Sequence, residues 1–192
     1  FGPGPLLRGG AGNDTVNAGS GTDTVWGGEG NDVLEGDYSG FGPESDRFLF
    51  DVSAGAANAD SIVLFDLGLD KIVLDGTVHV DIGASGNFAA GEPRFAANST
   101  GTAQDSSDRV VYNTATGELW YDNDGTGTGA AALIATLEGV PGLSATDIDV
   151  VNGSTGGGGD TIVGTEGDDT LVGTEGDGSI HGLGGDDDIS GL

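Results

Sequence analysis

The chain has 192 residues and carries 32 Asp and Glu against only 5 Lys and Arg, a formal charge of −27. This surplus of negative charge argues against partners such as nucleic acid or anionic membrane surfaces, and it opposes compaction unless cations are bound. Cysteine is absent, which excludes disulfides and thiolate metal sites, and no apolar run is long enough for membrane insertion.

The glycine content of the sequence divides the chain into three parts. Residues 1–40 contain 12 glycines and residues 153–192 contain 14, whereas the 112 residues between them contain only 14. We therefore expect a first repeat block at 1–43, a β-rich intervening and capping segment at 44–152, and a second repeat block at 153–192.

The first block repeats every nine residues. From Gly9 it reads GGAGNDTVN, AGSGTDTVW and GGEGNDVLE, with Gly at the fourth place, Asp at the sixth and an aliphatic residue at the eighth (Val16, Val25 and Leu34). Such a unit has room for a glycine-rich turn and a strand with one inward side chain. One buried side chain per nine residues cannot offset the entropy of ordering them, so another stabilising interaction is needed.

Calcium would supply that interaction, because it accepts a flexible cage of carbonyl and carboxylate oxygens and its binding energy becomes folding energy. Aspartate can also simply cap a turn. Aspartate recurs at the sixth place in six of seven such units, three at residues 9–35 and four at residues 155–190, and this recurrence favours the metal.

The intervening segment keeps echoes of the period. The motifs DRF at Asp46, DSI at Asp60 and DKI at Asp70 precede apolar runs, which predicts further strands. The TATG sequence predicts a turn between strands at 110–113 and 118–121, with the aromatic residues in packing roles. The stretch AAALIATL, residues 130–137, could form a helix or a strand.

An acidic turn, DNDGTG, follows the predicted hairpin and resembles the first half of an EF-hand loop. The twelfth loop position is Leu133 rather than Glu, which argues against an EF-hand. Asp122 and Asp124 are either ligands of a simpler metal site or residues of a turn without metal.

The period returns as TGGGGDTIV, GTEGDDTLV, GTEGDGSIH and GLGGDDDIS. This block ends within a unit, so we expect it to continue in a longer array or to stack on another copy, because repeat folds require capped ends.

The nonapeptides resemble the RTX, or hemolysin-type, calcium-binding repeat family. The resemblance implies an all-β fold in which parallel β-roll blocks flank a longer-stranded β segment, with two units per turn and calcium ions between stacked turns. Asp14 would then share an ion with Asp32, and Asp169 with Asp187. The site of Asp23 would be incomplete, because the pattern is lost after Gly36, and Asp160 would face Gly178 instead of a carboxylate.

The candidate calcium ligands are the sixth-place aspartates and the glycines of their turns. They are Gly10, Gly12, Asp14, Gly19, Gly21, Asp23, Gly28, Gly30, Asp32, Gly158, Asp160, Gly167, Asp169, Gly185 and Asp187, with Asp122 and Asp124 as the further pair.

The sequence gives no sign of catalysis. HExxH, GxSxG and phosphate-binding GK[ST] motifs are absent, and His79 and His181 stand alone, the latter at an outward place. We expect a non-enzymatic, calcium-binding structural module of a secreted or cell-surface protein such as an adhesin, S-layer or filament component. The alternatives are a carbohydrate-binding accessory module and the repeat domain of a type I-secreted hydrolase. The first residues lack signal-peptide features, so export would depend on a signal elsewhere.

Overall fold

The computed structural model describes residues 4–37, 44–154, 162–172 and 180–190. These residues are almost entirely β-structure, and the helical element among them is one 3-10 turn, η1, at Ala145–Asp147. The prediction of an all-β fold is confirmed. The strands are β1 Leu6–Ala11, β2 Thr15–Gly19, β3 Thr24–Glu29, β4 Val33–Asp37, β5 Arg47–Phe50, β6 Asp60–Val63, β7 Lys71–Asp75, β8 Gly86–Asn87, β9 Phe95–Asn98, β10 Val110–Asn113, β11 Glu118–Tyr121, β12 Ala132–Leu137, β13 Ile148–Val151, β14 Ile162–Val163, β15 Thr170–Val172, β16 Ile180–His181 and β17 Asp188–Ser190.

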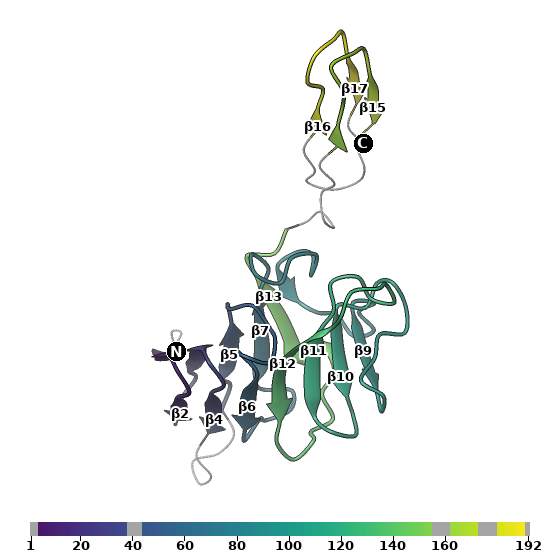
Figure 1. Cartoon of the computed structure of the whole chain (residues 1–192). Helices are drawn as coiled ribbons and strands as arrows, with labels where there is room; N and C mark the ends of the chain where they lie inside the picture. Colours follow the sequence, from purple (N-terminus) through teal and green to yellow (C-terminus); the bar gives the residue numbers. More distant parts are fainter. Residues whose placement is uncertain (1–3, 38–43, 155–161, 173–179, 191–192) are drawn as a thin grey trace.

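The first seven strands form a parallel roll (Figure 1). Odd-numbered strands join one sheet, ordered β1-β3-β5-β7-β13-β8, and even-numbered strands begin the other, ordered β2-β4-β6-β12-β11-β10-β9. The chain therefore completes one turn of the roll with every two strands. In the first block, Gly10 pairs with Gly28 and Val16 with Leu34, which confirms the expected two nonapeptides per turn.

The roll continues past the last regular nonapeptide. Phe48 of β5 pairs with Val25 and then with Ile72 of β7, while Ile62 of β6 pairs with Leu34. The DRF, DSI and DKI motifs thus mark three further strands, as predicted. Strands from residues 1–43 and from residues 44–152 share both sheets.

An antiparallel meander of β10, β11 and β12 extends the second sheet, and β9 pairs parallel with β10 at its edge. The predicted hairpin is confirmed: Val110 of β10 pairs with Tyr121 of β11. The segment that could have been helix or strand forms β12, which joins the hairpin to β6. Tyr112 is buried in this region, and its hydroxyl donates a 2.6 Å hydrogen bond to the carbonyl of Pro141, so it has a packing role.

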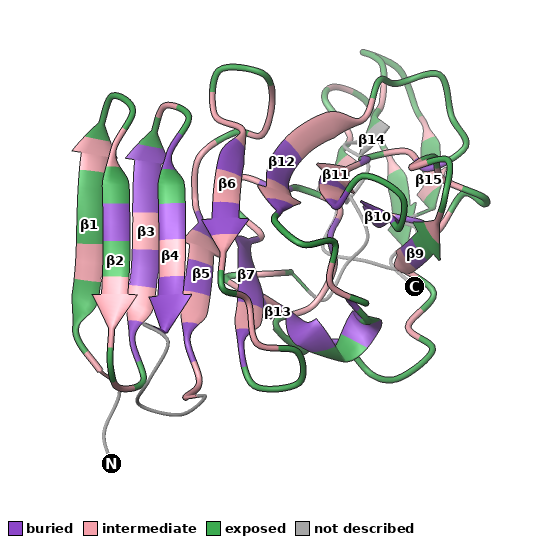
Figure 2. Cartoon of the chain, turned by 90° about the horizontal axis from the view of Figure 1, so that it is seen from below, coloured by how far each residue is buried: buried purple, intermediate pink, exposed green. Residues whose placement is uncertain are grey.

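One hydrophobic core runs through the roll and the meander, from Val16 to Val150. The eighth-place residues of the first block point into it, with Val16 8% exposed and Val25 and Leu34 fully buried. Figure 2 shows burial increasing from the outermost strand, β1, toward β3 and β4.

The second block forms two small sheets of its own, β14-β16 and β15-β17. Their registers also join residues one full turn apart, since Leu171 pairs with Ile189. Ile189 is 49% exposed despite its eighth place, because so small a roll has little interior. No helix among the described residues has the length and apolar composition needed to cross a membrane.

Candidate calcium-binding sites

The glycines of the first block allow the turns to stack closely. The second- and fourth-place glycines all have positive φ: Gly10, Gly12, Gly19, Gly21, Gly28 and Gly30. A Cβ on Gly28 or Gly30 would also overlap the carbonyl of Gly10 or Gly12 in the neighbouring turn. Only glycine meets both demands, which explains its recurrence at these places.

At the first place of a unit, glycine leaves room for oxygen atoms. A Cβ on Gly9 would lie 2.7 Å from the carbonyl oxygen of Gly27 and 2.9 Å from Oδ2 of Asp14. A carboxylate oxygen and a carbonyl oxygen of the next turn thus converge on one point. Gly27 is placed alike, because a Cβ there would overlap Oδ2 of Asp32.

The aspartates link successive turns. The backbone N–H of Asp14 donates to Oδ1 of Asp32 at 2.8 Å, and that of Asp32 donates to Oδ1 of Asp60 at 2.9 Å. The second oxygens, Oδ2 of Asp14 and Oδ2 of Asp32, are buried without a hydrogen-bond partner. A buried oxygen of this kind is costly unless another group binds it.

These hydrogen bonds from one aspartate to the next form a ladder along the roll. Asp23 belongs to a second such ladder, at the turns that precede β3, β5 and β7. Its N–H donates to Oδ1 of Asp46 at 2.9 Å, and the N–H of Asp46 donates to Oδ1 of Asp70 at 2.8 Å. Asp23 therefore has a partner turn, although the nonapeptide pattern is lost after Gly36. The residues inserted after Gly36 lengthen that turn, and the pairing of β5 with β3 returns Asp46 to the sixth place beside Asp23.

The carboxylate of Asp23 lies in a different setting from that of Asp14. The first place of its unit is Ala18, and a pocket of about 420 Å³ opens between this turn and Glu44. Oε2 of Glu44 is buried without a partner, and a Cβ on Gly21 would lie 3.8 Å from Oδ2 of Asp23 and 4.0 Å from Oε2 of Glu44. Burial raises the pKa of Asp23, and the carboxylates of Asp37 and Glu44 add to the effect.

Three aspartates in the longer turns that precede β5, β6 and β7 resist ionisation in the metal-free chain. The pKa is raised to about 7 for Asp46, about 7 for Asp60 and about 6 for Asp70, mainly by burial, with nearby carboxylates contributing. A bound cation would reverse this tendency, because an opposite charge favours the ionised form.

The second block repeats the aspartate link and the close approach of oxygens at the first place. Asp169 N–H donates to Oδ1 of Asp187 at 3.0 Å, and a Cβ on Gly164 would lie 2.5 Å from the carbonyl of Gly182 and 2.7 Å from Oδ2 of Asp169. Here Oδ2 of Asp169 accepts from the N–H and hydroxyl of Thr165. Gly185 has positive φ. Gly167 occupies the same fourth place, and a Cβ there would meet only Thr165 Oγ1, at 3.9 Å. The remaining candidates of this block, Gly158 and Asp160, and the expected facing residue Gly178 lie outside the described residues.

The acidic turn after β11 is held by its own aspartates. Oδ1 of Asp122 accepts the N–H of Asp124 at 3.2 Å and of Gly125 at 2.9 Å, so Asp122 caps the turn. Asp124 accepts the N–H of Gly129 at 2.9 Å through Oδ2, while its Oδ1 is buried without a partner.

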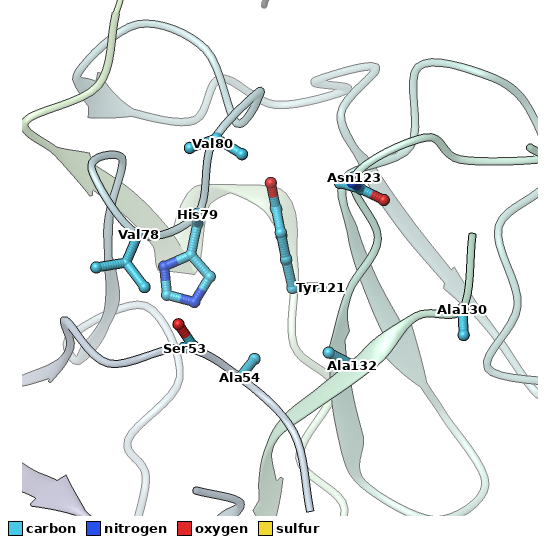
Figure 3. Close-up of a pocket in the computed structure, with 9 residues that line it drawn as sticks. All are labelled: Ser53, Ala54, Val78, His79, Val80, Tyr121, Asn123, Ala130 and Ala132. Carbon is cyan, nitrogen blue, oxygen red and sulfur yellow. The ribbon is translucent and has the colours of Figure 1, made fainter.

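Figure 3 shows a pocket that the sequence did not indicate, where His79 and Tyr121 face each other. His79 is buried, which lowers its pKa; its Nδ1 lies 3.1 Å from the carbonyl of Asp75, and its Nε2 has no partner. The Tyr121 hydroxyl is also buried and unpaired. The volume, about 230 Å³, is below that of common small-molecule sites. A lone histidine carries no sequence pattern that marks its burial. His181, by contrast, is exposed as expected.

The repeat turns suit calcium better than other metals. Their donors are carboxylate and carbonyl oxygens, which calcium prefers, and the paired aspartates Asp14 and Asp32 come from different turns. In the described part of the chain, no three His, Asp or Glu side chains are placed so that they alone could hold a metal ion, so backbone carbonyls would have to complete any site.

Comparison with protein-family models supports this assignment. The model of the RTX calcium-binding nonapeptide repeat matches four copies, at residues 6–37 and 154–189. Searches of curated proteins and of solved structures found no match to the chain. RTX nonapeptide repeats bind calcium. These two segments therefore carry RTX calcium-binding nonapeptide repeats.

Proposed function

We propose that the chain is a non-catalytic structural module that folds on binding several calcium ions. The repeated convergence of a buried, unpaired Asp Oδ2 on the carbonyl of the next turn carries this proposal, as at Gly9, Asp14 and Gly27. Each such turn places negative charge in the interior of a chain that already carries −27. Calcium would compensate that charge and add the stabilisation that the small core of each turn lacks.

The module acts outside the cell, in a secreted or surface protein such as an adhesin, S-layer or filament component. RTX repeats typically occur in secreted proteins. Calcium at extracellular concentrations would then hold the fold without disulfides, and the chain has no cysteine.

Self-association through the open end of the roll is part of the proposal. Strands β1 and β2 are the outermost strands of their sheets, each with one neighbour among the described strands. Such edges present unpaired N–H and C=O groups, and Leu6 in β1 is 44% exposed. Bound calcium would also weaken the repulsion between copies.

A calcium titration tests folding and assembly together. Circular dichroism should show a largely unfolded chain in chelator and a gain of β-structure on adding calcium. Magnesium should not replace calcium, because it requires stricter octahedral geometry. Sedimentation in millimolar calcium should show larger species than sedimentation in chelator. A full β-spectrum in excess chelator would contradict calcium-dependent folding, and a monomer at every concentration would contradict self-association.

A further inference from the structure

The turn between β4 and β5 lies beyond the segment that matches the repeat family, which ends at residue 37. Its Asp46 follows Gly36 by ten positions, whereas Asp14 follows Gly9 by five, so no nonapeptide pattern identifies it. The described residues on either side of the turn nevertheless take places like those of a regular unit.

A glycine, a carbonyl oxygen and a carboxylate oxygen meet at Gly36 as they do at Gly9, with the ring of Phe48 beside them. A Cβ on Gly36 would lie 2.7 Å from the carbonyl oxygen of Leu64, 3.4 Å from Cζ of Phe48 and 3.5 Å from Oδ2 of Asp46. Leu64 follows β6, which pairs with β4, just as Gly27 lies one turn beyond Gly9. A carboxylate oxygen and the carbonyl of the next turn therefore approach one point here as well.

Asp46 is fully buried, and half of its carboxylate has no partner. Oδ1 accepts the N–H of Asp23 at 2.9 Å, which fixes the orientation of the group, while Oδ2 is enclosed without a hydrogen bond. Asp70 occupies the same place one turn later, but both of its oxygens are used: Oδ1 accepts from Asp46 N–H and Oδ2 from Asp66 N–H, each at 2.8 Å. The buried, unpaired oxygen thus distinguishes Asp46 from Asp70.

We propose that this stretched turn holds a further calcium ion, with Asp46 Oδ2 and the Leu64 carbonyl as ligands. The inference rests on the proposed calcium-dependent fold and extends it beyond the repeats. The metal would bind the one oxygen of Asp46 that the fold leaves unpaired, and Gly36 would keep the space between the two ligands clear of a side chain.

The test compares Asp46→Asn with Asp70→Asn and Asp14→Asn in the full chain. Calcium bound per chain is measured by calorimetry and by native mass spectrometry. Asp46→Asn should bind one ion fewer than the unmodified chain, as should Asp14→Asn, whereas Asp70→Asn should bind the full number. An unchanged number in Asp46→Asn with a loss in Asp14→Asn overturns this inference and leaves the proposed function standing. A chain that binds no calcium overturns both.

A second measurement does not depend on the folding of any variant. Crystals of the unmodified chain grown in calcium should give an anomalous difference peak at about 2.3–2.6 Å from Asp46 Oδ2 and the Leu64 carbonyl oxygen. Peaks beside Asp14 and Asp32 with none beside Asp46 would overturn the inference.

Discussion

Glycines at the first and second places of a unit are required for different reasons. A Cβ on Gly27 would overlap the carboxylate of Asp32, whereas a Cβ on Gly10 meets nothing within 4 Å but stands on a backbone with φ of 117°. The first glycine therefore leaves room for the carboxylate that we propose as a calcium ligand, and the second allows a turn.

Alanine should separate these two roles. We expect Gly27→Ala to weaken calcium binding by about tenfold or more, as changes to groups that support a metal ligand commonly do. Gly10→Ala should instead lower the free energy of unfolding by about 1–3 kcal/mol through backbone strain, with a much smaller effect on affinity. Calorimetric titration and thermal unfolding in calcium measure the two quantities. Equal effects of both variants on affinity would contradict the assignment.

Among the strands, the side chain at the eighth place of a nonapeptide is buried in the first block and more exposed in the second. Leu34 in β4 is fully buried between stacked turns, whereas Ile189 in β17 is 49% exposed. Leu34→Ala should therefore cost about 2–5 kcal/mol of stability. Ile189→Ala should cost about 0.5 kcal/mol or less. Urea unfolding of the calcium-loaded chain, followed by circular dichroism, distinguishes these values. A comparable loss in both variants would mean that the second block has a packed interior.

The positions of the strands in the roll could be predicted from the sequence better than the pairing between strands and turns. The period located β2, β3 and β4, and the short Asp-x-apolar motifs located β5, β6 and β7, because a strand start is a local pattern. The partnership of Asp23 with Asp46 could not be predicted, because the inserted residues break the count and only strand pairing restores the register. The placement of β13 between β7 and β8 likewise depends on contacts between distant segments.

For the whole molecule, charge should make the calcium-free fold sensitive to pH. The carboxyl groups of Asp46, Asp60 and Asp70 have pKa values raised to about 6–7 in the fold, against about 3.9 in an unfolded chain. Their protonated forms therefore stabilise the fold at low pH, and this contribution is lost as the pH rises from about 4 to 7. Buried His79, whose pKa is lowered, acts in the opposite direction below about pH 6.5.

The effect of three carboxyl groups and of repulsion within an acidic chain on the stability of the fold should exceed that of one imidazole. We expect more β-structure at pH 5 than at pH 8 in calcium-free buffer, with a smaller difference in Asp46→Asn. Circular dichroism measures this, and light scattering controls for aggregation near the isoelectric point. Less β-structure at pH 5 than at pH 8 would contradict the raised pKa values.

The hydrogen bonds between aspartates give the roll a polarity. Each donated N–H points to a carboxylate one turn later: Asp14 to Asp32 and Asp32 to Asp60 in one ladder, Asp23 to Asp46 and Asp46 to Asp70 in the other. Oδ2 of Asp70 accepts the N–H of Asp66 within its own turn, so the second ladder ends at Asp70, before β13. The backbone of each turn is thus held by a carboxylate from the turn that follows it in the chain. Among the described strands, fraying of the roll should therefore begin at β1 and β2, each of which has one neighbour in its sheet.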